Sequence, residues 1–133
     1  MGKTMKTATL RSDSGLFLCV RQGQLHADEM TAEEAASNPD CHFTWDDSSS
    51  PFSLTTADGW YITPKQQGGE WFAFAIQGVS YTQFTTLHPN QSNDIQFFAE
   101  SSYFLSTGPK PVAATFTLIL PIFGTFTPHY IDD

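Results

Sequence analysis

The stretch that decides the fold is PFSLTTADGWYIT, residues 51–63, because its pattern occurs three times along the chain. It opens with an apolar anchor at Leu54, passes through a polar turn at residues 57–59 and closes on the bulky pair Tyr61-Ile62. Aspartate and glycine tolerate the positive φ angles of tight turns. The stretch therefore predicts a strand, a turn and a second strand.

Two further stretches repeat this pattern. LRSDSGLFL begins at residue 10 and FFAESSYFL at residue 97, against LTTADGWYI at residue 54, so the copies are about 43 residues apart. A second marker, a Phe-Thr pair, recurs at similar spacing at Phe43, Phe84 and Phe126. Phe116 is a rival third copy, but its choice would leave the last unit one strand short.

The repeats predict an all-β chain made of three units with about four strands each. The stretches 24–28, 71–76 and 115–120 supply a third strand for each unit. Self-similarity at this period indicates a closed, pseudo-symmetric fold, and propellers begin at about four blades. We therefore predict a β-trefoil, a six-stranded barrel capped by three hairpins. The 133 residues form one domain, 1–133, with repeats at approximately 7–50, 51–92 and 93–130.

One segment departs from the β pattern. Residues 27–36 are rich in helix formers, and Thr31 with Glu34 fits a capping box. Asn38-Pro39 would end such a helix. We expect a short helical turn in the first repeat and a plain loop at residues 66–69.

The first repeat resembles a fascin-type β-trefoil unit, the fold of actin-crosslinking proteins. The matching positions are Phe17, Leu18, Gly23, Leu25, Pro39, Asp40, Cys41 and Phe43. The likeness is clear over residues 8–63, moderate near 83–106 and weak after 107. It implies the fold and, through the family, actin binding. The chain has one trefoil where fascins have four, and it lacks the clustered bases that an acidic filament would attract.

Charge narrows the class of partner. The chain carries 14 acidic residues against 6 Lys and Arg, a formal net charge of −8. Nucleic acids and anionic membranes require a basic footprint, and no apolar run approaches the length of a membrane span. We therefore expect neither a nucleic acid nor a membrane as a partner. Two cysteines without a secretion signal indicate reduced thiols and a cytoplasmic location.

No catalytic motif or metal-ligand spacing is present, so we expect no enzyme, no cofactor and no metal. Cys41 and His42 are adjacent, but neighbours in a strand point to opposite faces. We interpret Cys41 as a buried thiol beside an exposed histidine.

Aromatic residues beside polar ones suit sugar binding, because rings stack on C–H faces while polar groups hold hydroxyls. Trp45 shares the face of Phe43 and is expected in the core, whereas Trp71 is expected to be half exposed. The candidate ligand-binding residues are Asp46, Trp60, Trp71, Tyr81, His88, Asn90 and Asn93.

The sequence therefore predicts a non-enzymatic recognition module that binds a glycan or a protein. Carbohydrate binding of the lectin type is the first hypothesis. A fascin-like module that binds actin or another cytoskeletal protein is the second. A protease inhibitor that presents the loop at residues 27–39 is the third.

Overall fold

The computed structural model describes residues 5–46, 51–78, 82–88, 93–99, 103–118, 121 and 123–131. The chain begins with β1 (Met5–Ser12), β2 (Phe17–Arg21), β3 (Gln24–Asp28), α1 (Ala32–Ala36), the 3-10 helix η1 (Pro39–Cys41) and β4 (Phe43–Asp46). It continues with β5 (Thr55–Thr56), β6 (Tyr61–Gln67), β7 (Glu70–Ile76) and β8 (Phe84–Leu87). The last elements are β9 (Gln96–Ala99), β10 (Tyr103–Ser106), β11 (Val112–Ala113), β12 (Thr115–Thr117) and β13 (Phe126–Tyr130).

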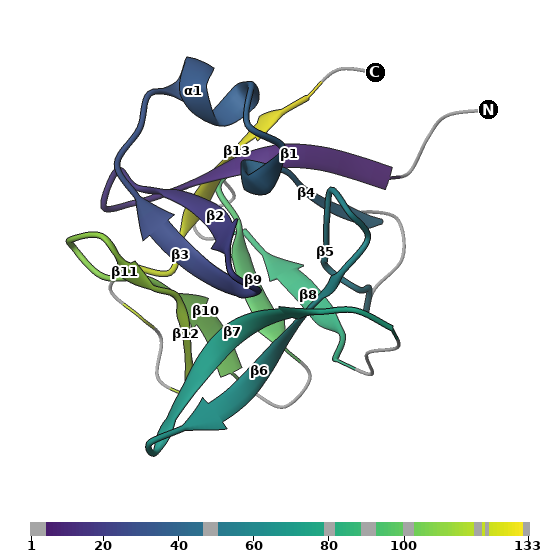
Figure 1. Ribbon diagram of the computed structural model, residues 1–133, viewed down its shortest axis with the longest axis vertical. Coiled ribbons are helices and arrows are strands. Elements are labelled where there is room, and N and C mark those ends of the chain that lie inside the picture. The colour runs from purple at the N-terminus through teal and green to yellow at the C-terminus, as the bar shows by residue number, and fades with distance from the viewer. Residues whose placement is uncertain are drawn as a thin grey trace.

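A ring of antiparallel strands forms the barrel (Figure 1). β1 pairs with both β4 and β13, β4 pairs with β5, and β8 pairs with β9. Two isolated bridges complete the ring: Phe52 joins the β5 segment to β8 at Phe84, and Ile95 joins the β9 segment to β13 at Phe126. Closure leaves none of these segments as an open sheet edge.

Three hairpins cap the barrel, namely β2–β3, β6–β7 and β10–β12. The hairpins also touch one another, because β3 pairs with β7 at Gln24 and Phe74, and β7 pairs with β12 at Trp71 and Phe116. A barrel with three hairpins is the β-trefoil that the repeats predicted. Phe116 lies in β12 and Phe126 opens β13, which confirms the choice of Phe126 as the third copy of the Phe-Thr marker.

The repeated apolar positions meet in one core. All of them are at most 1% exposed and belong to a single hydrophobic cluster: Leu10, Leu18, Phe43, Leu54, Ile62, Phe84, Phe97, Leu105 and Phe126. Trp45 is also fully buried, as expected from its spacing to Phe43, and its ring meets Phe97 edge to face at 5.5 Å. Side chains one strand residue apart alternate between faces, so the same spacing puts the same positions inward in every repeat.

The opening turn has the same hydrogen bonds in the first two repeats. Ser12 N–H donates to Leu16 O at 2.7 Å, and Thr56 N–H donates to Trp60 O at 2.9 Å. The glycines of these turns, Gly15 and Gly59, have φ of 90° and 81°, a region that residues with a Cβ rarely enter. Turn geometry therefore requires the glycine that ends each of the triplets DSG and ADG.

The predicted helix is confirmed. Thr31 is the N-cap of α1, its hydroxyl accepts from Glu34 N–H at 3.1 Å, and the Glu34 carboxylate accepts from Thr31 N–H at 2.8 Å. With five residues α1 is short, and no helix in the described ranges is long and apolar enough to cross a membrane.

Two local expectations were wrong. Residues 66–69 are no plain loop: Gln66 and Gln67 end β6, and Gly68-Gly69, both with positive φ, turn directly into β7. Cys41 is buried as expected, but it lies at the end of η1 rather than in a strand, so its burial comes from packing against β2 and not from strand alternation.

The exposed carboxyl of Asp13 provides a prediction on pH. Partial burial raises its pKa, the nearby charge of Asp94 raises it further, and hydrogen bonds with the backbone of Asp13 and Thr125 oppose the rise. A raised pKa in the folded state means that stability is lost as pH rises through that pKa. We expect Asp13→Asn to raise the melting temperature slightly at about pH 7, with a gain in the free energy of unfolding of less than about 1 kcal/mol, and to leave it unchanged at about pH 2, where both side chains are neutral. A lower melting temperature at neutral pH, measured by calorimetry, would contradict this.

Candidate functional site

The five predicted ligand-binding residues that the structure describes do not gather into one site. Trp60 and Trp71 are both half-buried and lie in separate depressions. His88 and Asn93 are exposed, and the His88 ring Nδ1 lies 3.1 Å from Asp94 O. Asp46 ends β4 and is half-buried. Tyr81 and Asn90 are outside the described residues.

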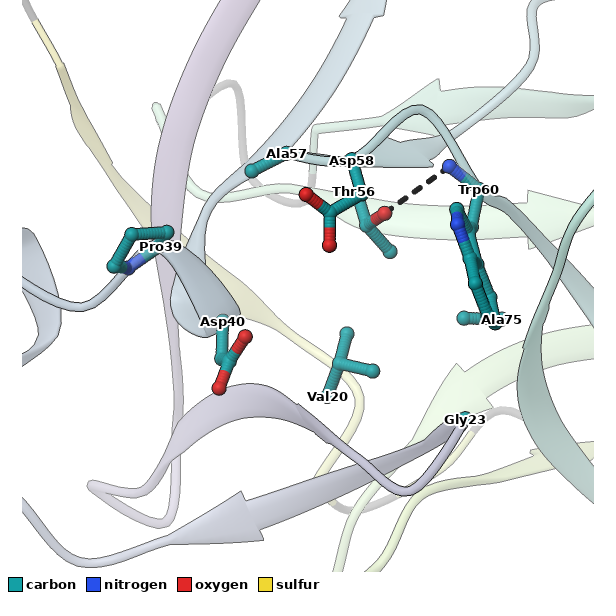
Figure 2. A pocket seen from close by; sticks show the side chains of 9 residues that line it. All are labelled: Val20, Gly23, Pro39, Asp40, Thr56, Ala57, Asp58, Trp60 and Ala75. Carbon is teal, nitrogen blue, oxygen red and sulfur yellow. Dashed lines mark hydrogen bonds between the residues drawn. The ribbon is translucent and has the colours of Figure 1, made fainter.

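The pocket beside Trp60 combines an aromatic wall with carboxylates (Figure 2). It has a volume of about 130 Å³. It is lined by Val20, Gly23, Pro39, Asp40, Thr56, Ala57, Asp58, Trp60 and Ala75. In Figure 2 the Trp60 indole stands at one side, Pro39 and Asp40 lie at the other, and Asp58 extends from the turn above. We call this depression the Trp60 pocket.

Four separate parts of the chain build the pocket, and one of them, β7, supplies Ala75. The turn between β5 and β6 supplies Asp58 and Trp60, and Thr56 Oγ1 fixes it by accepting from Trp60 N–H at 3.1 Å. η1 supplies Asp40, whose N–H donates to the side-chain oxygen of Asn38 at 3.0 Å. The end of β2 supplies Val20, half-buried between the two. Each contributing turn is held by its own hydrogen bonds, so the pocket is preformed.

The Trp60 side chain contacts the hydrophobic core as well as the pocket. It packs against the main hydrophobic cluster and is neither fully buried nor fully exposed. One part of the indole therefore stabilises the core while another part lines the pocket. The Trp60 indole therefore contributes to the core and to the wall of the pocket.

The pocket is acidic. Asp40 and Asp58 are both exposed, and within the described ranges neither carboxylate has an ion pair. No Lys, Arg or His is among its lining residues. Sequence reasoning assigned Asp40 to the fold and Asp58 to turn geometry, and did not single out Val20 at all. No local signal places η1 beside the β5–β6 turn, because that contact is long-range.

A second depression surrounds Trp71. Its indole ring lies 5.7 Å from the Tyr103 ring in a tilted arrangement. Threonines of β12 and the side chain of Leu118, which is 64% exposed, form the rest of a shallow surface of about 370 Å³. The half-exposure expected for Trp71 is confirmed, but the surface offers one carboxylate, Glu70, at its rim.

A third depression, of about 250 Å³, is the basic counterpart of these two. It lies between β1, the start of α1 and β13, and Arg11 and His129 line it together with Phe17. The Phe17 and His129 rings are 5.9 Å apart.

The two thiols pack together under α1. Cys19 and Cys41 are 6% and 0% exposed, share a small cluster with Phe17 and Ala35, and are free, as expected. The Cys19 thiol donates to Asp28 Oδ2 at 2.9 Å, and Arg21 pairs with the same oxygen.

This environment keeps Cys19 protonated. The neighbouring Cys41 thiol, burial and the Asp28 carboxylate all raise the pKa of Cys19. The neighbouring Cys19 thiol lowers the pKa of Cys41, while burial opposes that change. His42 does not activate either thiol, because its Nε2 lies 2.8 Å from Ala36 O. The pair is a packed core element, and the described residues contain no group of three His, Cys, Asp or Glu that could hold a metal ion.

Comparison with known proteins supports the architecture. No family model matches the sequence, and no curated protein matches it. Among solved structures, the chain is similar to a ricin B-like lectin of Macrolepiota procera, solved in complex with lactose. The two superpose with a TM-score of 0.69 over 96% of each chain, at 13% sequence identity. At that identity the likeness shows the fold, so the chain shares the β-trefoil architecture of this lectin.

Proposed function

We propose that the protein is a non-enzymatic carbohydrate-binding module and that the Trp60 pocket is its binding site. The observation that carries the proposal is the meeting of the Trp60 indole with the carboxylates of Asp40 and Asp58 around one preformed pocket. An indole face packs on the C–H groups of a sugar ring, and carboxylates accept hydrogen bonds from hydroxyls. Val20 and Ala75 extend the apolar wall beside the indole.

The similar β-trefoil structure agrees with this proposal, since that protein is a lectin described with bound lactose. Its overall likeness does not choose the site on this chain. The choice rests on the pocket itself, because small-ligand sites combine an apolar concavity with a few convergent polar groups. The Trp71 surface has a single carboxylate, Glu70, at its rim, and we assign it no primary role in sugar binding.

The other two hypotheses have less support. For the protease inhibitor, the segment 27–39 carries α1 and η1, whereas a loop that mimics a substrate must be extended. For a fascin-like actin partner, the net charge of −8 repels an acidic filament. Filament binding therefore serves as the competing outcome in the test.

The test is a glycan array followed by titration of the best ligand against two variants. We expect Trp60→Ala to lower affinity by about 2 kcal/mol, a roughly thirtyfold loss, because truncating a central aromatic residue has an effect of this size. Trp71→Ala is the matched control, since it removes a half-buried indole from the other depression, and it should leave affinity unchanged.

Circular dichroism and thermal melting establish that both variants are folded. A blank array together with co-sedimentation of the wild-type protein with actin filaments would overturn carbohydrate binding. Equal losses in Trp71→Ala and Trp60→Ala would overturn the choice of pocket.

A further inference from the structure

The charge of the Trp60 pocket is set by two carboxylates on different elements. Asp40 belongs to η1 and Asp58 to the β5–β6 turn, and they lie on separate sides of the indole-walled pocket. The described basic side chains are elsewhere. Arg21 pairs with Asp28, and Lys6 and Lys65 lie over the rings of Tyr130 and Phe74. Arg11 lines the basic depression, and the exposed Lys110 does not line the Trp60 pocket. Nothing in the described chain neutralises Asp40 and Asp58.

A pocket of this kind prefers a cation. The two carboxylates attract positive charge directly, and the face of an indole attracts a cation through its quadrupole. The net charge of −8 adds a field of the same sign over the whole molecule. A neutral sugar would use the hydrogen-bond acceptors but none of this electrostatic attraction.

The walls indicate a ring rather than a flexible chain. Val20, Ala57 and Ala75 line the pocket together with Pro39, so an apolar surface continues from the indole on more than one side. A rigid ring with one apolar face and a charged substituent fits such a site with little loss of conformational freedom.

From these observations, and resting on the proposed carbohydrate binding, we infer that the ligand is an amino sugar with a free ammonium group, that is, a hexosamine unit that is not N-acetylated. The ring packs on Trp60, and the ammonium lies between the carboxylates of Asp40 and Asp58. N-acetylation removes the charge and adds bulk, so the acetylated unit binds less well.

The experiment compares β-1,4-linked glucosamine oligomers with N-acetylglucosamine oligomers of equal length by isothermal titration calorimetry. At low ionic strength we expect the free amine form to bind about five- to tenfold tighter, the size expected for two partly exposed ion pairs. Salt screens exposed charges, so added salt should reduce this preference and leave the acetylated form unaffected.

Two isosteric variants locate the effect. Asp40→Asn and Asp58→Asn should each reduce the preference about two- to threefold, and the double variant should abolish it. The acetylated oligomer should still bind to the double variant, because the Trp60 indole remains and each asparagine keeps an oxygen that accepts hydrogen bonds. The control is Glu29→Gln, which removes the same charge at an exposed position that does not line the pocket and should keep the preference.

The outcomes separate this inference from the proposal beneath it. Equal affinity for both oligomers, unchanged in the double variant, would overturn the ammonium preference and leave carbohydrate binding standing. Absence of binding to every glycan would overturn both. Competition by a lysine-containing peptide as strong as that of the glucosamine oligomer would show recognition of an ammonium group without a sugar ring, and would overturn the amino-sugar assignment.

Discussion

Replacement of Phe97 by alanine is expected to lower the free energy of unfolding by about 3–5 kcal/mol, the range for truncating a buried phenylalanine. Phe97 is fully buried at one of the repeated anchor positions. Its ring meets Trp45 edge to face at 5.5 Å and lies 6.2 Å from Phe126, so it joins side chains from β4 and β13. A cavity there removes contacts from several barrel strands at once.

The matched control is Phe98→Ala, the same chemical change one residue along the same strand. Phe98 points to the other side of β9, where it is half-buried and contacts Phe104 at 4.8 Å between ring centroids. We expect a loss of about half the Phe97 effect or less, since a partly exposed ring has less buried area to lose. Urea unfolding followed by far-ultraviolet circular dichroism measures both. Similar losses in the two variants would show that Phe97 is not part of a rigid core.

The fold could be predicted because the pattern of core residues occurs three times in the sequence. An anchor such as Leu54, a turn such as Asp58-Gly59 and a marker such as Phe84 are each weak signals, but hydrophobic periodicity and turn chemistry are local properties. Repetition in phase makes their joint occurrence informative. The same reasoning located α1, since a capping box needs only Thr31 and Glu34.

The site could be predicted only in part. The sequence marks Trp60 as a candidate binding residue because it is an aromatic residue in a polar turn, and the structure places it in the wall of a pocket. Asp40 and Val20 were not visible as site residues, because their proximity to Trp60 depends on how η1 and β2 pack beside the β5–β6 turn. His88 and Asn93, chosen for their polar neighbourhood, are exposed in a loop and line none of the three depressions described here.

Local errors had local physical causes. Residues 66–69 looked like a loop because of two glycines, but two consecutive positive φ angles are what a two-residue hairpin turn requires. Glycine content alone does not distinguish a tight turn from a longer loop. The strong pairing of β6 with β7 on both sides of Gly68-Gly69 decides between them.

The second large effect concerns Gly124, which is buried just before β13. A Cβ at this position would lie 2.1 Å from Cγ of Pro121 and 3.0 Å from the backbone oxygen of Leu105. Neither neighbour can move away easily, because the proline ring is rigid and Leu105 lies in the core strand β10. Overpacking of this kind costs about 1–3 kcal/mol and occasionally more, and we expect Gly124→Ala to reach the upper end of that range.

A second glycine separates steric crowding from backbone conformation. Gly69 has nothing within 4 Å of an added Cβ, but its φ is +87°. Gly69→Ala should therefore destabilise by about 1–2 kcal/mol through backbone strain alone. Urea unfolding of both variants gives the comparison, and a Gly124→Ala protein as stable as wild type would show that the segment before β13 can shift away from β10. Since β13 closes the barrel against β1, overpacking at Gly124 strains the same closure that Phe97 and Phe126 stabilise from inside the barrel.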